Sequence, residues 1–173
     1  MSPGKATRYH DEYAKHGSCC VFLAFEPQTG FRYVEVRARR TAVDYAQFMQ
    51  NLLDKHDSHA ESIRLVQDNL NTHTPGSFYE VLPPGEAFEL SQRFAPHDTP
   101  KKGSWLNMAE TECAALAKPC LDRRIPALDT LRQEVLAWAH KRNRDRKTVN
   151  WTFSQSDARN KLQRHYKNIQ KLI

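Results

Sequence analysis

The segment SCCVFLAF, residues 18–25, is almost entirely apolar. A short strand that is apolar at every position is typical of a strand buried on both faces of a sheet. The turn-forming sequence EPQTG follows, with Pro27 and Gly30, and FRYVEVRAR then continues with strand-forming residues such as Tyr33, Val34 and Val36. The pattern predicts a β-hairpin with cover on both faces, which restricts the chain to a layered fold.

Helices and a second strand region follow the hairpin. Thr41 and Asp44 form a capping-box pattern. The apolar residues after them recur at helical spacing: Tyr45, Phe48, Met49, Leu52 and Leu53. A strand is predicted over 63–67, a short helix from Pro75 to about residue 82, a second to about residue 94, and a brief extended segment over 95–100.

The last part of the chain is predicted to be helical. Its first helix would turn Leu106, Ala109 and Cys113 to the core, with Glu112 pointing elsewhere. A second helix follows Pro126, and Ser154 and Asp157 open a third. The tryptophans are expected to pack rather than bind a ligand: Trp105, Trp138 and Trp151. The element order predicts an α/β fold in which helices flank a mixed sheet.

Composition fits one domain. The chain has 173 residues, of which 39% are hydrophobic and 27% charged. No segment approaches the length of a membrane span, and the first residues have no apolar signal core. The cysteines form no Cys-x-x-Cys pair, so we expect buried thiols in a reducing cytoplasm: Cys19, Cys20, Cys113 and Cys120.

The positive charge is concentrated at the C-terminal end. Residues 141–173 contain ten Lys and Arg residues against Asp145 and Asp157, whereas the whole chain has a net charge of +6. A basic tail of this kind favours binding to polyanions, above all nucleic acid, although a solvated helix face would have the same composition.

Two carboxylates are candidates for chemistry. Asp68 follows the strand 63–67 directly, and Glu110 begins the helix after the next extended segment. Functional groups of open α/β sheets gather outside strand ends, and converging carboxylates suit a hard cation such as Mg²⁺. Asp and Asn are also ordinary residues at the start of a loop, so Asp68 alone is a weak signal. Asp44 is explained as a helix-capping residue, and Asp98 has no motif behind it.

The sequences VQDNLNTH and PKKGSWLNMAETE, taken together, closely resemble the DDE transposases of bacterial insertion sequences, in the group numbered 630 that is related to the mariner elements. FLAFEPQTGFR, DYAQFMQNLL, CLDRRIPALDTLRQEV and VNWTFSQSDARNKL extend the resemblance over essentially the whole chain. Such proteins act on DNA in the bacterial cytoplasm, at the nucleoid.

The resemblance implies a ribonuclease H-like domain in which three carboxylates hold two Mg²⁺ ions, with Mn²⁺ as a substitute. Water attacks at the transposon ends, and the freed 3′-hydroxyl attacks target DNA at a TA step. Asp68 and Glu110 would be the second and third carboxylates. The residues expected to support them are Asn69, Asn71, His73 and Asn107. The residues expected to contact DNA are Lys101, Lys102, Ser104, Arg142, Arg144, Arg146 and Lys147. For His73, Lys101, Lys102 and Ser104, an ordinary loop role is an equal alternative.

The sequence departs from the family pattern at its beginning. The first Asp of the family, the central strand that holds it and the N-terminal helix-turn-helix would precede Pro3. We therefore expect residues 1–173 to be a partial catalytic domain with a basic tail over 141–173, lacking the first strand and inactive alone. The alternative is a non-enzymatic fragment that regulates transposition by binding DNA, by self-association or by pairing with full-length transposase.

Overall fold

The computed structural model describes residues 17–100, 103 and 106–163. The strands of this part of the chain form two separate two-stranded sheets. In the first, β1 (Cys20–Glu26) pairs antiparallel with β2 (Phe31–Arg37), so the predicted hairpin is confirmed. In the second, β3 (Ile63–Gln67) pairs in parallel with β4 (Phe94–Asp98). The mixed α/β architecture is confirmed, but antiparallel and parallel pairs do not share one sheet among these residues.

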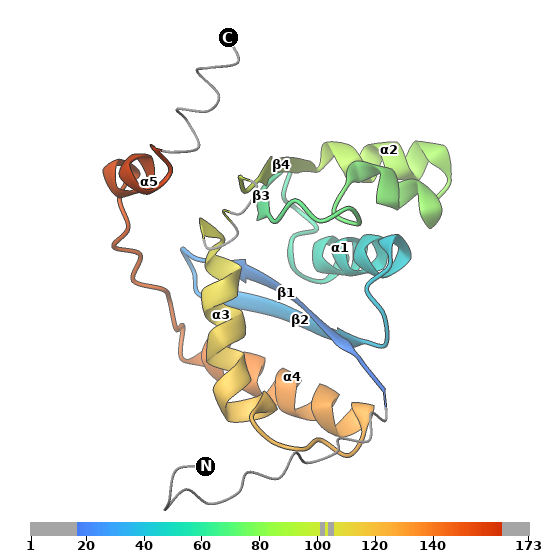
Figure 1. The fold of residues 1–173 in the computed structure, drawn as a ribbon. Coiled ribbons are helices and arrows are strands. Elements are labelled where there is room, and N and C mark those ends of the chain that lie inside the picture. Colours follow the sequence, from blue (N-terminus) through green and yellow to red (C-terminus); the bar gives the residue numbers. More distant parts are fainter. Residues whose placement is uncertain (1–16, 101–102, 104–105, 164–173) are drawn as a thin grey trace, which may run out of the picture.

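Helices lie on both sides of the hairpin (Figure 1). They are α1 (Ala42–His56), the 3₁₀ turn η1 (Pro75–Glu80), α2 (Pro84–Gln92), α3 (Met108–Leu116), the π-helical turn η3 (Ala117–Leu121), α4 (Leu128–Arg144) and α5 (Gln155–Lys161). In Figure 1, α1 lies between the hairpin and the β3–β4–α2 region, α4 covers the opposite side of the hairpin, and α5 stands away from the body. No helix in the described part of the chain is long and apolar enough to cross a membrane.

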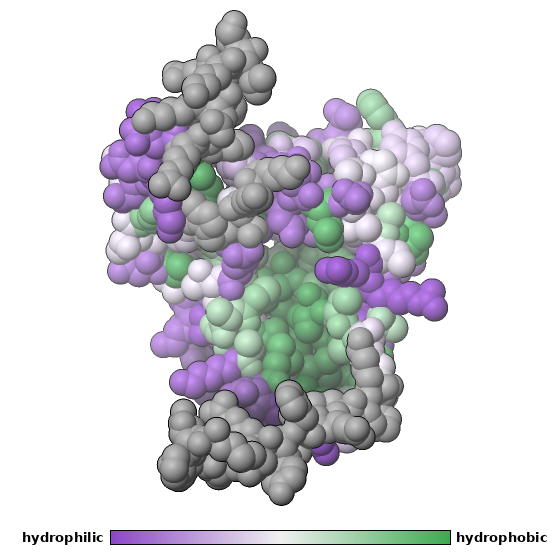
Figure 2. All heavy atoms as spheres, viewed as in Figure 1, coloured by the Kyte–Doolittle hydropathy of each residue, from purple (hydrophilic) through white to green (hydrophobic). Residues whose placement is uncertain are grey.

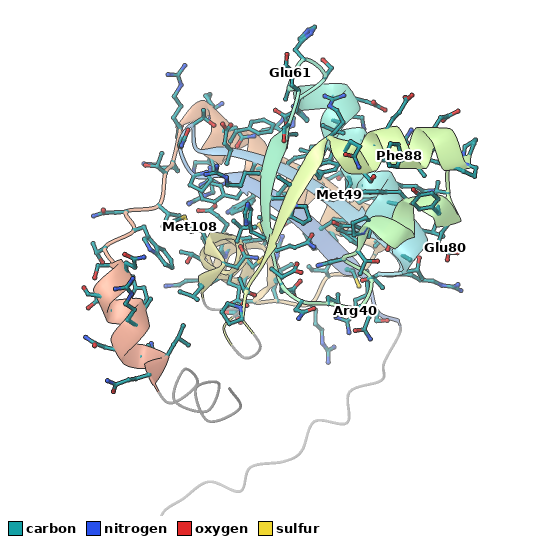
Figure 3. All side chains as sticks on the ribbon, turned by 90° about the horizontal axis from the view of Figure 1, so that it is seen from above. Arg40, Met49, Glu61, Glu80, Phe88 and Met108 are labelled. Atoms are coloured by element: carbon teal, nitrogen blue, oxygen red, sulfur yellow. The ribbon has the colours of Figure 1, made fainter. Side chains whose placement is uncertain are left out.

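One hydrophobic cluster surrounds α1. The apolar face predicted from the sequence is buried, and it packs against partly buried side chains of β1 and β3. Phe22 contributes from β1, Leu65 from β3 and Phe94 from β4. Figure 3 shows Met49 of α1 at the centre of the molecule, with Glu61 and Glu80 at its periphery. One hydrophobic cluster around α1 therefore receives side chains from both sheets.

A second cluster lies on the opposite side of the hairpin. Val34 and Val36 of β2 pack against α3, η3 and α4, and Leu116, Leu131 and Val135 are their buried partners. The predicted face of α3 is wrong, because Cys113 is exposed whereas Glu112 is fully buried. Most of the cysteines are not buried either: Cys19 is exposed, Cys20 is partly exposed, and Cys120 is the buried one. Trp138 packs at the edge of this cluster, and Trp151 contacts Phe153 outside both clusters.

No described strand pairs with the outer edge of β1. Its residues from Cys20 to Phe25 are all partly exposed, although they are the most apolar run in the chain. Figure 2 shows hydrophobic residues gathered in a hollow over the hairpin. On the other sheet, Val66 of β3 is 51% exposed. Apolar strands with unpaired edges normally pair with another strand or are covered.

We expect Thr41→Ala to lower the free energy of unfolding by about 1 kcal/mol, since the Thr41 hydroxyl caps α1 by accepting from the Asp44 amide. Ser154→Ala is the matched control, because Ser154 caps α5 with the same box, but α5 contains no buried residue. A helix that buries nothing unfolds locally without affecting global stability. Urea denaturation checks both variants, and equal losses would contradict this reading of α5.

Candidate active site

Asp68 lies where β3 ends and the following loop begins. Its side chain is 47% exposed, and its Oδ1 atom lies 2.6 Å from Nδ1 of His73. The two groups are in close contact without the alignment of a hydrogen bond. His73 is itself fixed, because its ring stacks on Tyr45 with a centroid separation of 4.7 Å. One carboxylate oxygen of Asp68 is therefore held by a supported ring.

Gln67 fixes the backbone around Asp68, a role that the sequence analysis missed. Its buried side chain accepts from the Tyr45 hydroxyl at 2.9 Å and donates to the His73 carbonyl at 2.7 Å. It also donates to Oδ1 of Asp98 at 3.0 Å. One glutamine thus closes the loop from Asp68 to His73. The signal available in the sequence was a polar residue, Gln67, at the last position of the predicted strand 63–67.

The hydroxyl of Tyr45 is shared by this network. Burial raises the pKa of Tyr45, and the negative charges of Asp98 and Asp68 raise it further. The hydroxyl therefore stays protonated and remains the donor to Gln67. Both aspartates act on the same phenol, which places two negative charges at the adjoining ends of β3 and β4.

Glu110 lies in the first turn of α3 with an exposed side chain. The helix begins there because Asn107 is its N-cap, accepting from the Ala109 amide at 3.0 Å. Asn107 therefore supports α3 rather than contacting Asp68 in this structure. An exposed carboxylate in a first turn also interacts favourably with the helix dipole.

Glu112, two residues later, points into the protein. Its carboxylate accepts from Nε of Arg32 on β2 and from two nitrogens of Arg142 on α4, at 3.0 and 2.9 Å. The side chains of Arg32 and Glu112 are both 0% exposed. Residues two apart on a helix face different directions, so the burial of Glu112 makes Glu110 face outward.

Arg32, Glu112 and Arg142, together with Asn143, form what we call the buried arginine cluster. Burial alone would raise the pKa of the Glu112 carboxyl, but the hydrogen bonds from Arg32 and Arg142 hold it below its usual value. Asn143 adds two 2.8 Å hydrogen bonds to the backbone of Arg32. The cluster fixes the rotation of α3 against β2 and α4.

The other predicted site residues are spread over three places. Asn69 and Asn71 are exposed in the loop after Asp68, and Lys101, Lys102 and Ser104 lie outside the described residues. The guanidinium of Arg142 forms an ion pair with the Glu112 carboxylate. Arg144, Arg146 and Lys147 are exposed at the end of α4.

The donor chemistry of Asp68 and Glu110 suits a hard divalent cation, because carboxylate oxygens are the preferred ligands of Mg²⁺. Within residues 17–100, 103 and 106–163, no group of three or more His, Cys, Asp or Glu residues is arranged to hold a metal ion.

A family model described as DDE superfamily endonuclease matches residues 1–132 of this chain. The match includes Asp68, Glu110 and Glu112 and ends within α4. No curated protein and no solved structure matches the chain.

Proposed function

This chain belongs to the DDE superfamily of endonucleases, and on that basis we propose that it is part of a transposase catalytic domain from a bacterial insertion sequence. Its reaction would be the hydrolysis of a phosphodiester bond at each transposon end, followed by attack of the freed 3′-hydroxyl on a phosphodiester of target DNA at a TA step, which displaces a 3′-hydroxyl of the target strand. The observation that carries the proposal is the family match, which spans both candidate carboxylates.

Asp68 and Glu110 are the residues that would hold Mg²⁺, or Mn²⁺ in its place. When bound there, the metal would help to activate the attacking oxygen and would stabilise charge on the phosphate. Asp68 has one oxygen in contact with His73, which leaves the other free and limits rotation of the carboxylate. Support of this kind commonly tunes carboxylate ligands of metals. Glu110 is held outward by the burial of Glu112.

The catalytic unit is completed, on this proposal, by a further strand between β1 and β3 that carries the remaining carboxylate. Three observations support it: the hydrophobic cluster around α1 takes side chains from both sheets, no described strand pairs with the second edge of the apolar β1, and no described strand joins β1 to β3. A strand in this place would turn the two sheets into one mixed sheet of the ribonuclease H type.

A second candidate function follows from the same open edges. The edges of β1 and β3 that pair with no described strand can add a strand from another polypeptide. Pairing with a full-length transposase in this way would regulate transposition without any catalysis by this chain.

Cleavage of supercoiled DNA in Mg²⁺ or Mn²⁺ tests the proposal. We expect the chain of residues 1–173 to be inactive alone, and the chain joined to a strand that ends in a carboxylate and fills the gap to cleave. A joined chain that is folded but inert in both metals would contradict the catalytic proposal and favour the regulatory one. Cleavage by residues 1–173 alone would contradict the need for a completing strand.

A further inference from the structure

The turn that ends α4 has an unusual backbone. Arg146 has φ of 45°, and it is the one non-glycine residue with positive φ in the described part of the chain. This left-handed region disfavours side chains with a Cβ atom, so helices that end in such a turn usually have glycine there. An arginine at this position keeps a costly conformation that glycine would relieve, and strain of this kind clusters at functional sites.

Backbone hydrogen bonds define this turn. The Arg146 amide donates to the Asn143 carbonyl at 3.1 Å, and the Lys147 amide donates to the Arg142 carbonyl at 3.0 Å. This is the Schellman pattern, with Arg146 in the position that glycine normally occupies. The conformation is therefore a regular helix ending and not an irregular loop.

The buried arginine cluster holds the turn against the hairpin. Arg32 donates to the Lys147 carbonyl, Arg142 is bound to Glu112, and Asn143 is bonded to the backbone of Arg32. Gly30, at the hairpin turn, has so little room that a Cβ atom there would lie 3.1 Å from the Lys147 carbonyl oxygen. The position of Arg146 and Lys147 is thus set by a rigid part of the protein.

The side chains of this turn are available to a ligand. Lys141, Arg146 and Lys147 are exposed, and their side chains make no hydrogen bond or ion pair with the described residues. Arg144 is exposed as well, and Asp145 is the single acidic residue among them, 3.9 Å from the Arg144 guanidinium. Unpaired positive charges on a fixed backbone suit a ligand with several negative charges.

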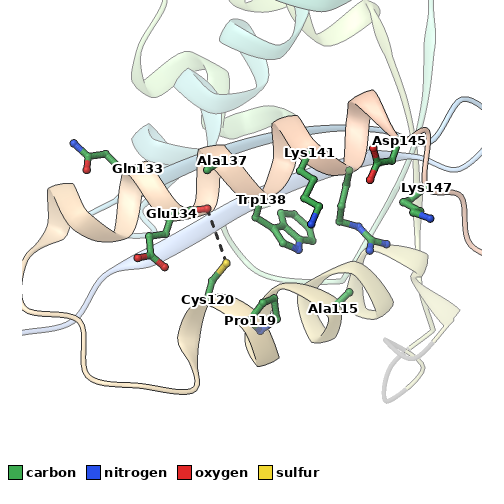
Figure 4. Close-up of a pocket in the computed structure, with 11 residues that line it drawn as sticks. Ala115, Pro119, Cys120, Gln133, Glu134, Ala137, Trp138, Lys141, Asp145 and Lys147 are labelled. Atoms are coloured by element: carbon green, nitrogen blue, oxygen red, sulfur yellow. Dashed lines mark hydrogen bonds between the residues drawn. The ribbon is translucent and has the colours of Figure 1, made fainter.

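A groove of about 760 Å³ runs beside the turn, between α4 and the α3–η3 segment. Trp138 and Pro119 contribute apolar surface, and Lys141 and Lys147 are among the lining residues. In Figure 4, Lys141 extends beside the Trp138 ring toward the groove, with Asp145 and Lys147 at the same end. Lys141 and Lys147 therefore contribute to the lining of a concave surface that also includes the acidic Glu134 and Asp145.

We propose that Arg146, Lys147 and Lys141 form a preorganised contact for the phosphate backbone of DNA, positioned by the buried arginine cluster. The proposal rests on the proposed function, because a DDE endonuclease acts on DNA. It adds a contact that lies beyond residues 1–132, the range matched by the family. Phosphates are the acceptors that arginine and lysine bind most generally on DNA.

Arg146→Gly separates binding from stability. Glycine removes the charge and relieves the positive φ, so we expect the melting temperature to stay the same or rise, while affinity for duplex DNA falls about fivefold or more. The slope of log affinity against log salt should become shallower by about 1. Arg146→Lys keeps the charge in the same backbone and should retain most of the affinity. Fluorescence anisotropy with labelled duplex DNA, in the presence of a chelator, measures the affinity and the salt slope of the wild type and of both variants. Thermal denaturation measures their melting temperatures.

Arg64→Gln is the matched control, because it removes one exposed positive charge from β3, away from the turn. Loss of affinity equal to that of Arg146→Gly would show a general charge effect and overturn the proposal. Unchanged affinity in Arg146→Gly would also overturn it. So would competition by polyglutamate that displaces the labelled DNA as well as unlabelled DNA does, which would favour an acidic protein partner. Binding in a chelator needs no cleavage, so failure of this contact is distinguishable from failure of the catalytic proposal.

Discussion

Glu112→Gln is expected to lower the free energy of unfolding by about 3–5 kcal/mol. The side chains of Glu112 and Arg32 are both 0% exposed, so removing the negative charge leaves a buried guanidinium without compensation. The second partner, Arg142, is partly exposed and can turn to water. The loss is a large fraction of the stability of a typical domain. Urea denaturation monitored by circular dichroism measures it.

Glu110→Gln is the matched control for this prediction. It makes the same chemical change on the same helix, but the side chain is exposed, so we expect a change below about 0.5 kcal/mol. Stabilities of the two variants within 1 kcal/mol of each other would contradict the assignment of Glu112 as the buried partner of Arg32.

The same pair predicts the response to acid. The folded-state pKa of Glu112 is lowered, so its contribution to stability is complete above the ordinary glutamate pKa of about 4.3 and is lost as the pH falls through the lower folded value. The unfolding free energy of the wild type should therefore fall more steeply below about pH 4.3 than that of Glu112→Gln. Parallel plots of unfolding free energy against pH for the two proteins would contradict the assignment of this pH dependence to Glu112.

Asp68→Asn and Glu110→Gln, each made in the catalytically complete enzyme, should reduce metal-dependent DNA cleavage more than about 100-fold. Loss of a group that only supports a metal ligand commonly costs 10–100-fold, and loss of a ligand should exceed that. His73→Ala, which removes the contact to Asp68, should fall within the smaller range. Initial rates on supercoiled DNA, at saturating Mg²⁺, give the comparison.

Glu89→Gln on α2 is the control for that series, because it neutralises an exposed carboxylate outside the candidate site. We expect it to keep full activity. Stability must also be measured for each variant, and we expect Asp68→Asn and Glu110→Gln to remain folded because both side chains are at least partly exposed. Full activity in either of these two would contradict its assignment.

Local patterns in the sequence were sufficient for the hairpin and for α1. The apolar spacing from Tyr45 to Leu53 and the pair of Thr41 and Asp44 lie within one helix, and the structure contains both the buried face and the cap. Such elements depend on neighbouring residues, and their periodicity can be read directly.

The orientation of α3 could not be obtained in the same way. Its apolar residues suggested a face through Cys113, but the buried positions are Glu112 and Leu116. A buried glutamate is stable here because Arg32 and Arg142, 80 and 30 residues away in sequence, reach it. Long-range ion pairs leave no periodic signal, although an arginine within the apolar strand FRYVEVR was a local hint. Gln67 was missed for a related reason, since its partners come from three separate segments.

The central claim is that Asp68 and Glu110 hold the same metal ion, or the same pair of metal ions. Paramagnetic broadening of backbone amide signals by Mn²⁺, in isotopically labelled protein, tests it without any need for catalysis. The account predicts that the loop after β3 and the first turn of α3 broaden together at the same Mn²⁺ concentration, and that Asp68→Asn removes both effects. Broadening of only one segment, or of both in Asp68→Asn as in the wild type, would contradict the claim.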